Sequence, residues 1–533
     1  MGDQLNAWLL FDPGSPGCPD AEIVTRRSDG TLERSTYAEV GLRTQRLMHG
    51  LDDLQLDRSR PVGTLAWNGA RHLEAYLAVP CTGRVLHTLN VRLSPEELAF
   101  ILQDADDQAI LVDTDFLPLL AQVRDIVGDL PPVIVLDDAV PDSDLPGLLS
   151  YEDLLSRQPD AYDRLDIAET APMGLCYTSG TTGRPKGVVS THRSTFLHAL
   201  AVTSAAGMSI GPRDSVLPQV PMFHACAWGM PYAAAMVGAK QVFFGGALDA
   251  KAFVDLLVEE RVTVTAGVPT VWLTVADELS RRDPCLRDLR HIVCGGSQPP
   301  AALIMRFREE FGIELVQAWG MTETSPLASV AWPQERMRDW SSQEIVEAAS
   351  SQAGLPLPGV RIGIRDAEGH AVPRDGATMG DLWVRGPWVV DGYLHGVGDD
   401  AFTDDGWFRT GDVAIGSASG YFVIADRTKD LIKSGGEWIS SVDLEAAIMK
   451  MDAVAEAAVI AVPDPRWLER PLACVVLRAG HRVPTEEFRR HLEGLGFASW
   501  QLPDRFELLD EIPKTSVGKF DKKVLRAQFV PAG

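Results

Sequence analysis

Short apolar runs alternate with longer helix-like stretches through most of the chain. Each run has four or five residues, the length of a short buried strand. Strands that alternate with helices form parallel sheets, because each crossover returns the chain to the same end of the sheet. The pattern therefore predicts an α/β fold with parallel-rich sheets. The clearest strand and helix pairs are 61–65 with 68–78, 109–112 with 116–127, 241–244 with 249–260, and 262–266 with 269–279.

The pattern changes after about residue 354. Short β-like pieces lie between turns rich in Gly, Pro and Asp at 360–364, 381–385 and 421–424, which predicts a small β-barrel-like subdomain. Beyond Asp426 the pattern is α+β, and Ser440 is placed to cap a helix with Asp443 three residues on. We place the domain boundary there, with a large domain at 1–427 and a mobile one at 428–533. The expected elements of the second domain are strands 457–462 and 472–477 and a helix near 485–495.

Composition narrows the classes of function. The 533 residues include 74 acidic and 49 basic side chains, a net charge of −25, which disfavours nucleic acid and anionic membranes as partners. Seven scattered cysteines without a C-x-x-C spacing argue against a disulfide framework or a zinc site. The longest apolar run, 228–239, is too short to span a membrane, and the N-terminus has no signal-peptide pattern. We expect a soluble cytoplasmic protein.

Residues 177–187 read Tyr-Thr-Ser-Gly-Thr-Thr-Gly-Arg-Pro-Lys-Gly and follow an apolar run. Glycines let a backbone turn tightly and bring its N–H groups against phosphate oxygens, while hydroxyls and Lys186 add donors and charge. A Walker loop places its lysine after a glycine, whereas here Lys186 precedes one. The stretch therefore predicts a phosphate-binding loop of another kind, rather than a plain linker or a Walker NTPase.

Four more motifs follow the same logic. They read Ala-Trp-Asn at 66–68, Leu-His-Thr-Leu-Asn at 86–90, Gln-Ala-Trp-Gly-Met-Thr-Glu-Thr-Ser-Pro at 317–326, and Lys-Asp-Leu-Ile-Lys-Ser-Gly-Gly-Glu-Trp at 429–438. With the phosphate loop, they resemble the adenylate-forming (ANL) superfamily of acyl-CoA synthetases, luciferases and peptide-synthetase adenylation domains. The resemblance runs from Tyr37 to Arg526 and is strongest to bacterial medium- and long-chain fatty acyl-CoA synthetases.

The resemblance implies ATP-dependent activation of a carboxylic acid. An acid oxygen joins the α-phosphorus and pyrophosphate leaves, so the site needs cations and oriented donors. Lys186 would bind the β- and γ-phosphates, Thr322 the α-phosphate, and Glu323 with Thr178 would hold Mg²⁺ through oxygen ligands. Lys519 would bridge the substrate carboxylate and the phosphates, so Lys519→Ala should abolish pyrophosphate exchange.

The rest of the nucleotide site is implied in the same way. Trp319 would stack on adenine, Asp412 would accept both ribose hydroxyls with Arg427 nearby, and the glycine turn at 295–297 would line adenine and the acyl site. The implied nucleotide-binding residues are Thr178, Ser179, Gly180, Thr181, Thr182, Gly183, Gly296, Ser297, Gln317, Ala318, Trp319, Gly320, Asp412 and Arg427.

The acyl pocket is expected around Pro-Met-Phe-His-Ala-Cys-Ala-Trp at 221–228. His224 would lie near the carboxylate, and Trp228 matches a tryptophan that gates the fatty-acyl tunnel in relatives. Gln298 stands where fatty-acyl relatives usually carry alanine, and Cys226 replaces a common asparagine. An amide in the tunnel fills space and needs partners, so we expect a medium-chain, aryl or polar-substituted acid. The implied pocket residues are Phe223, Trp228, Val268, Thr270, Gln298 and Met321.

Coenzyme A is the expected acceptor. The resemblance makes Lys429 a hinge, and implies that Lys433, Gly435, Gly436 and Trp438 turn toward the site for the second half-reaction. An amine, a carrier-protein thiol or a nitrite-type oxyanion stays open as an alternative acceptor or substrate. A phosphotransferase or nucleotide sensor would instead release ADP or no product. The oligomeric state is open, with a homodimer among the expectations.

Overall fold

The computed structural model describes residues 4–178, 184–282, 286–427, 430–434, 437–478, 480–514 and 520–530. The chain forms two compact units, one made of Met1–Arg361 with Arg385–Gly406 and the other of Ile362–Val384 with Trp407–Gly533. The segment with short β-like pieces thus groups largely with the C-terminal residues, whereas the sequence placed it in the large domain. The functional boundary near residue 428 stays a prediction.

The first unit contains a nine-stranded and a seven-stranded sheet. The nine-stranded sheet has the order β16 (Leu355–Pro356), β15 (Leu327–Val330), β14 (Glu314–Gly320), β13 (His291–Cys294), β12 (Val264–Gly267), β10 (Ser215–Pro218), β11 (Lys240–Phe244), β1 (Glu22–Arg26) and β2 (Leu32–Thr36). The seven-stranded sheet has the order β7 (Leu149–Ser150), β6 (Val133–Val135), β5 (Ile110–Val112), β3 (Pro61–Leu65), β4 (Val85–Thr88), β8 (Pro172–Thr178) and β9 (Lys186–Thr191).

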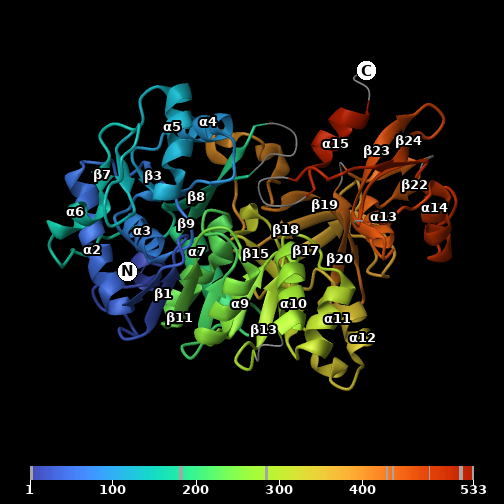
Figure 1. Cartoon of the computed structure of the whole chain (residues 1–533), viewed down its shortest axis with the longest axis horizontal. Coiled ribbons are helices and arrows are strands. Elements are labelled where there is room, and N and C mark those ends of the chain that lie inside the picture. Colours follow the sequence, from blue (N-terminus) through green and yellow to red (C-terminus); the bar gives the residue numbers. More distant parts are fainter. Residues whose placement is uncertain are drawn as a thin grey trace. The chain divides into compact units, whose positions relative to one another are not determined.

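Strands β11, β10, β12, β13 and β14 run parallel, as the alternating pattern predicts. Helices α9 (Ala250–Glu259), α10 (Pro269–Arg282) and α11 (Ala301–Glu310) lie side by side along this sheet (Figure 1). Their core is aromatic: the fully buried Trp272 ring meets Phe253 and Phe307 edge-on at 6.1 and 6.2 Å. This packing fixes the strands whose ends carry the expected site motifs.

Further helices cover the two sheets of the first unit. The longest, α2, begins at a capping box in which Thr36 and Glu39 satisfy each other's backbone N–H groups. The helices are α1 (Ala7–Leu10), α2 (Tyr37–Asp53), α3 (Ala70–Cys81), α4 (Pro95–Ala105), α5 (Leu117–Val127), α6 (Tyr151–Ser156), α7 (His192–Thr203), α8 (Met230–Val237) and α12 (Ser342–Ile345).

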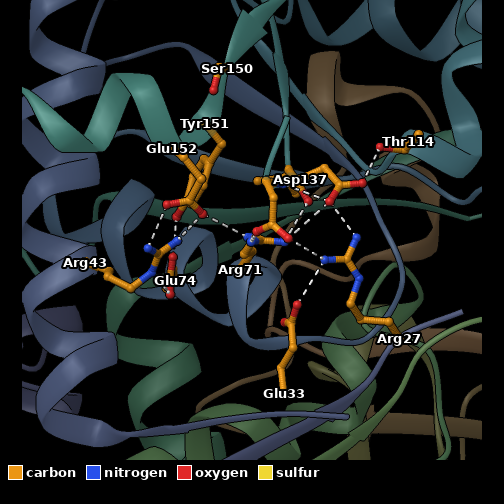
Figure 2. A network of polar contacts seen from close by, with 12 residues as sticks. Arg27, Glu33, Arg43, Arg71, Glu74, Thr114, Asp137, Ser150, Tyr151 and Glu152 are labelled. Carbon is orange, nitrogen blue, oxygen red and sulfur yellow. Dashed lines mark hydrogen bonds and ion pairs between the residues drawn. The ribbon is translucent and has the colours of Figure 1, made fainter. Parts of the chain in front are cut away.

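A network of charges, with Glu74 buried at its centre, joins α2, α3 and α6. Figure 2 shows the Arg43 guanidinium between two carboxylates, with its Nε 2.7 Å from Glu74 Oε1 and its Nη2 2.8 Å from Glu152 Oε1. Tyr151 donates its hydroxyl to Glu74, which is almost wholly buried. Burial raises the pKa of Glu74, although Arg43 acts to lower it. Arg71 also pairs with Glu152, with its Nε 3.1 Å from Glu152 Oε1, so both arginines form ion pairs with carboxylates of the same unit.

The second unit contains a four-stranded antiparallel sheet and an α+β portion. The first sheet has the order β17 (Arg361–Arg365), β18 (Met379–Arg385), β19 (Phe408–Gly416) and β20 (Phe422–Arg427). The other has β22 (Glu437–Ile439), β21 (Ile432–Ser434), β24 (Leu468–Leu477) and β23 (Val454–Asp464), with β25 (Arg505–Leu508) paired to β24. The helices are α13 (Ser441–Ile448), α14 (Thr485–Gly494) and α15 (Lys522–Phe529).

Several local expectations are confirmed. Ser440 accepts a hydrogen bond from the Asp443 backbone and begins α13. The expected strand 61–65 has the bounds of β3, and the helix expected near 485–495 is α14. No helix among the described residues is long and apolar enough to cross a membrane.

Candidate functional site

Four of the expected site segments lie at one edge of the nine-stranded sheet. Four neighbouring parallel strands, β10, β12, β13 and β14, end at this edge. Segment 220–228 follows β10, Val268 follows β12, the glycine turn at 295–297 follows β13, and Met321 with Thr322 follows β14. Ligands of open α/β sheets bind outside the carboxyl ends of strands, so the topology alone marks this edge as the candidate site.

The segment after β10 holds an unusual backbone. Ala225, Cys226, Ala227 and Trp228 all have positive φ angles, between 44° and 55°, and form one left-handed turn. Such angles are uncommon outside glycine and usually need support from surrounding structure. Asn68 supplies part of it: its side-chain amide donates to the carbonyls at 218 and 220, and its oxygen accepts from the backbone at 222.

The left-handed turn places Trp228 against the glycine turn that follows β13. The Trp228 side chain is buried, at 8% exposure. A Cβ added at Gly295 would lie 2.9 Å from the Trp228 Cη2 atom and 3.0 Å from the Ala318 carbonyl oxygen. Gly295 is therefore needed for close approach of the indole, and Trp228 covers this part of the candidate acyl pocket. Gly296 follows with a φ of +82°, which favours glycine.

Lys186 lies at the start of β9, opposite Thr178 in the β8–β9 hairpin. Its ammonium lies 4.8 Å from the centroid of the Tyr393 ring. Tyr393 donates its hydroxyl to Glu323 Oε1 at 2.6 Å. Burial and the Glu323 charge raise the pKa of Tyr393, so the hydroxyl stays a donor at neutral pH. The structure thus brings Lys186 and Glu323 to opposite ends of one tyrosine.

Gly398 completes this arrangement. Its φ is +93°, and a Cβ at this position would lie 2.0 Å from the Lys186 ammonium nitrogen. Within the described ranges, no carboxylate lies within ion-pair distance of Lys186. Its neighbours are an aromatic face and a glycine backbone, which leave its charge available to an anionic ligand.

Glu323 lies in a short 3₁₀ turn, Thr322–Thr324, directly after β14. The Thr324 hydroxyl accepts a 2.9 Å hydrogen bond from the Met321 backbone and fixes this turn. Glu323 is buried, at 5% exposure, and Thr322 lines a cavity of about 40 Å³. Gln317 and Trp319 lie buried in β14, where Gln317 is the last residue paired in parallel with β13 and Trp319 pairs antiparallel with Ser329 of β15.

The second unit contains the remaining expected site residues that the structure describes. Asp412 on β19 and Arg427 on β20 are paired in register, with Arg427 Nε 3.2 Å from Asp412 Oδ1. The Asp412 carboxyl is almost fully buried, while Arg427 keeps about a third of its side chain exposed. In the β21–β22 hairpin the Lys433 ammonium lies 4.5 Å above the exposed Trp438 ring.

An exposed aromatic surface adjoins this hairpin and was missed from the sequence. Ser434 pairs with Leu468, the neighbour of Trp467, and Arg466 stacks over the Trp467 ring at 4.6 Å. Trp467 and Leu468 expose 41% and 67% of their surface. An Arg-Trp-Leu turn carries no spacing signal by itself, so only the strand pairing reveals that it adjoins the β21–β22 hairpin.

Three cations of segment 514–526 are paired with carboxylates of the same unit. Lys514 pairs with Glu456, Lys522 with Glu445 at 2.6 Å, and Arg526 with Asp430. Burial acts to lower the pKa of Lys522, but the charges of Glu445, Asp426 and Asp430 together raise it overall. These three cations hold the fold.

Two expected pocket residues, Phe223 and Gln298, lie elsewhere than the contact between Trp228 and Gly295. Phe223 is buried in the core, 6.1 Å from the Trp67 ring and 5.6 Å from the Arg92 guanidinium. Gln298 is exposed, and its amide donates to the Ser351 carbonyl at 3.1 Å. That bond satisfies the amide without an acyl ligand.

Five further expected site residues differ in their exposure. Val268 and Met321 lie partly buried at the strand ends, as does His224 at the start of the left-handed turn, while Ser297 and Thr270 are exposed. Nine expected residues lie outside the described ones: Ser179, Gly180, Thr181, Thr182, Gly183, Lys429, Gly435, Gly436 and Lys519.

Comparison with protein-family models decides the family. The model described as AMP-binding enzyme matches residues 15–394, and the model described as AMP-binding enzyme C-terminal domain matches residues 443–519. The chain belongs to the AMP-binding enzyme family. The adenylate-forming resemblance is thereby confirmed.

Individual relatives agree over the whole length. A long-chain-fatty-acid–CoA ligase of Thermus thermophilus is 46% identical over 99% of this chain and 96% of its own. A 3-methylmercaptopropionyl-CoA ligase of Ruegeria lacuscaerulensis is 40% identical over 98% of this chain and 97% of its own. The crystal structure of ATP-bound MatB from Rhodopseudomonas palustris superposes with a TM-score of 0.85 at 25% identity, covering 98% of this chain and 99% of that one.

These matches confirm the expected fold class, mixed α/β with a separate C-terminal α+β portion. They also confirm the enzyme class. The chain is an AMP-forming acid–CoA ligase, which activates a carboxylic acid with ATP and transfers it to coenzyme A.

Proposed function

We propose that this member of the AMP-binding enzyme family acts on a medium-chain, aryl or polar-substituted carboxylic acid in preference to a long unbranched one. The observation that carries the proposal is the buried Trp228 ring against the Gly295 backbone. A long chain threading past this turn must displace a buried indole that leaves no room for a Cβ at Gly295, whereas a short acid need not. Displacement loses buried contacts in a densely packed region.

The relatives support a choice between two substrate classes. One is named as a long-chain-fatty-acid–CoA ligase, and the other as a 3-methylmercaptopropionyl-CoA ligase. We assign this chain to the second side of that choice. Gln298 contributes less than its sequence position suggested, because its amide already bonds to the Ser351 carbonyl.

At the nucleotide end, we propose that Lys186 and Thr322 bind phosphates and Glu323 holds Mg²⁺. Among described residues no group of three or more His, Cys, Asp or Glu side chains could hold a metal. Mg²⁺ commonly takes one or two carboxylates and completes its shell with phosphate oxygens and water, so a single buried Glu323 fits it. When bound, Mg²⁺ would neutralise phosphate charge. Tyr393 would orient Glu323 through their 2.6 Å hydrogen bond.

In the second unit, we propose that Asp412 accepts the ribose hydroxyls and that Arg427 fixes its carboxylate. Lys433 and Trp438, with the neighbouring Arg466 and Trp467, offer aromatic faces and cations suited to the adenine and phosphates of coenzyme A. Lys519 keeps the predicted role of bridging carboxylate and phosphates. A cytoplasmic location and a homodimer also stay predictions.

An acid panel tests the proposed specificity. Pyrophosphate release is measured with and without coenzyme A for octanoate, benzoate, 3-methylmercaptopropionate and palmitate, with mass spectrometry of the products. We expect the highest kcat/KM with one of the first three acids, and Trp228→Ala to raise palmitate relative to them. Palmitate as the preferred substrate of the wild-type enzyme would contradict the proposal.

A further inference from the structure

Two cysteine thiols face each other beside the candidate site. Cys176 lies on β8, and Cys226 lies in the left-handed turn after β10. Their sulfur atoms are 3.8 Å apart although fifty positions separate them in sequence. The other described cysteines, Cys18, Cys81, Cys294 and Cys474, have no such thiol neighbour among the described residues. The pair is thus a distinct feature of this chain's interior.

A cavity lies between this pair and the turn after β14. It has a volume of about 40 Å³, and its lining includes both cysteines together with Thr322 and Ser325 from the turn after β14. About 10–15 Å³ suffices for one water molecule, so the cavity has room for a molecule of that size. Thr88 also reaches the pair, with its hydroxyl 3.1 Å from the Cys176 sulfur. Polar groups and thiols therefore share one small chamber.

We propose that Cys176 and Cys226 form an oxidation site at which hydrogen peroxide closes a reversible disulfide and switches the enzyme off. The sulfur of one cysteine, as thiolate, attacks a peroxide oxygen; the O–O bond breaks, water leaves, and a sulfenic acid remains. The second sulfur then attacks the sulfenic sulfur, the S–O bond breaks, and a second water leaves. In total two thiols and one peroxide give one disulfide and two waters.

The disulfide must move the left-handed turn or the end of β8. A bond needs the sulfurs about 2.05 Å apart, so the 3.8 Å contact shortens by nearly half. Cys226 lies two residues before Trp228, whose ring rests on the Gly295 backbone. Cys176 lies two residues before Thr178, which pairs with Lys186 across the hairpin. Forming the disulfide therefore displaces the left-handed turn that carries Trp228, or the end of β8 opposite Lys186, or both.

The inference is independent of the particular acid, because bond formation is measured on the protein itself. Wild-type enzyme and the variants Cys176→Ser, Cys226→Ser and Cys18→Ser are treated with hydrogen peroxide. Cys18 is the matched control, since it is partly exposed like Cys226 but has no thiol neighbour among the described residues. Each sample is analysed by intact mass, by non-reducing peptide mapping, and by pyrophosphate release relative to its own untreated rate, before and after dithiothreitol.

We expect wild type and Cys18→Ser to lose the mass of two hydrogen atoms, to yield a peptide linking Cys176 with Cys226, and to lose most pyrophosphate release until dithiothreitol restores it. Cys176→Ser and Cys226→Ser should keep their own starting rates. Absence of the linked peptide in wild type overturns the proposal, even if a variant fails to fold. So does a linked peptide with an unchanged rate, or an equal rate loss in Cys226→Ser.

Discussion

The network around Arg43 and the cluster around Lys186 lie in the same compact unit but satisfy their charges differently. Arg43 lies between Glu74 and Glu152 at hydrogen-bond distance, and these contacts join three helices (Figure 2). Lys186 instead faces the Tyr393 ring and the Gly398 backbone. A cation that is paired with carboxylates contributes to the stability of the fold. A cation without a carboxylate partner is available to bind a phosphate.

The second unit repeats the contrast. Lys522 is buried against Glu445 and also donates to the Ser441 hydroxyl at 2.6 Å, so it ties α15 to α13. Lys433 lies exposed over the Trp438 ring. The sequence alone does not distinguish these two lysines. Their partners in the fold do.

The largest effect on stability is expected at Arg43. Arg43→Gln leaves Glu74 buried without its cation, which typically costs about 3–5 kcal/mol in the free energy of unfolding. We expect activity per folded molecule to be unchanged, because the network contacts none of the expected site residues. Urea unfolding and active-site-normalised rates measure both. A large fall in kcat/KM at full stability would break the comparison.

A carboxyl beside the same network gives a pH-dependent effect. Burial raises the pKa of Asp113 to about 7, against about 4 when unfolded. Between these values the folded chain holds a proton that the unfolded chain releases, so stability falls as pH rises from about 4 to 7. Asp113→Asn removes this loss and keeps an acceptor for the 2.6 Å bond from the Trp67 backbone.

We expect Asp113→Asn to match wild type at pH 4 and to exceed it at pH 8 by about 4 kcal/mol. Urea unfolding across this pH range measures the difference. An advantage that is constant with pH would show that the charge is not its cause.

Tyr393→Phe should lower kcat/KM about tenfold, the equivalent of about 1.4 kcal/mol, because the ring under Lys186 remains while the hydrogen bond to Glu323 is lost. Tyr162→Phe is the matched control, since Tyr162 donates a 2.6 Å bond to Asp52 away from the site. Steady-state kinetics should separate the two variants. Equal losses in both would remove the special role of Tyr393.

The smallest effect is expected at an exposed pair. Lys251 bonds Asp255 one turn along α9 at 2.8 Å, with most of its side chain in solvent. Lys251→Gln should change the free energy of unfolding by less than about 0.5 kcal/mol and leave activity unchanged. Urea unfolding checks this, and a larger change would mean that exposed pairs matter more here than their surroundings suggest.

Much of the fold follows from local sequence. The run 61–65 is β3, and the cap at Ser440 is present, because both depend on neighbouring residues. The topology also follows, since parallel strands bring the motifs at 295–297 and 317–323 to one edge. These predictions needed only the order of strands and helices.

Contacts distant in sequence could not be predicted. Tyr393 and Gly398 reach Lys186 from more than two hundred residues away, and no spacing rule connects them. The Cys176 and Cys226 sulfurs meet only because the left-handed turn folds back on β8. Likewise, the carboxylate partners of Lys514, Lys522 and Arg526 lie far from them in the sequence.

ATP–pyrophosphate exchange in Lys186→Ala, compared with Lys240→Ala, tests the central claim most directly. Lys240 is the matched control because it pairs with Glu22 at 2.7 Å and Glu260 at 2.8 Å. We predict that Lys186→Ala loses exchange by about 100-fold or more at unchanged unfolding free energy, while Lys240→Ala loses stability and keeps exchange. Near-normal exchange in Lys186→Ala, or equal losses of exchange in both variants, would contradict the account.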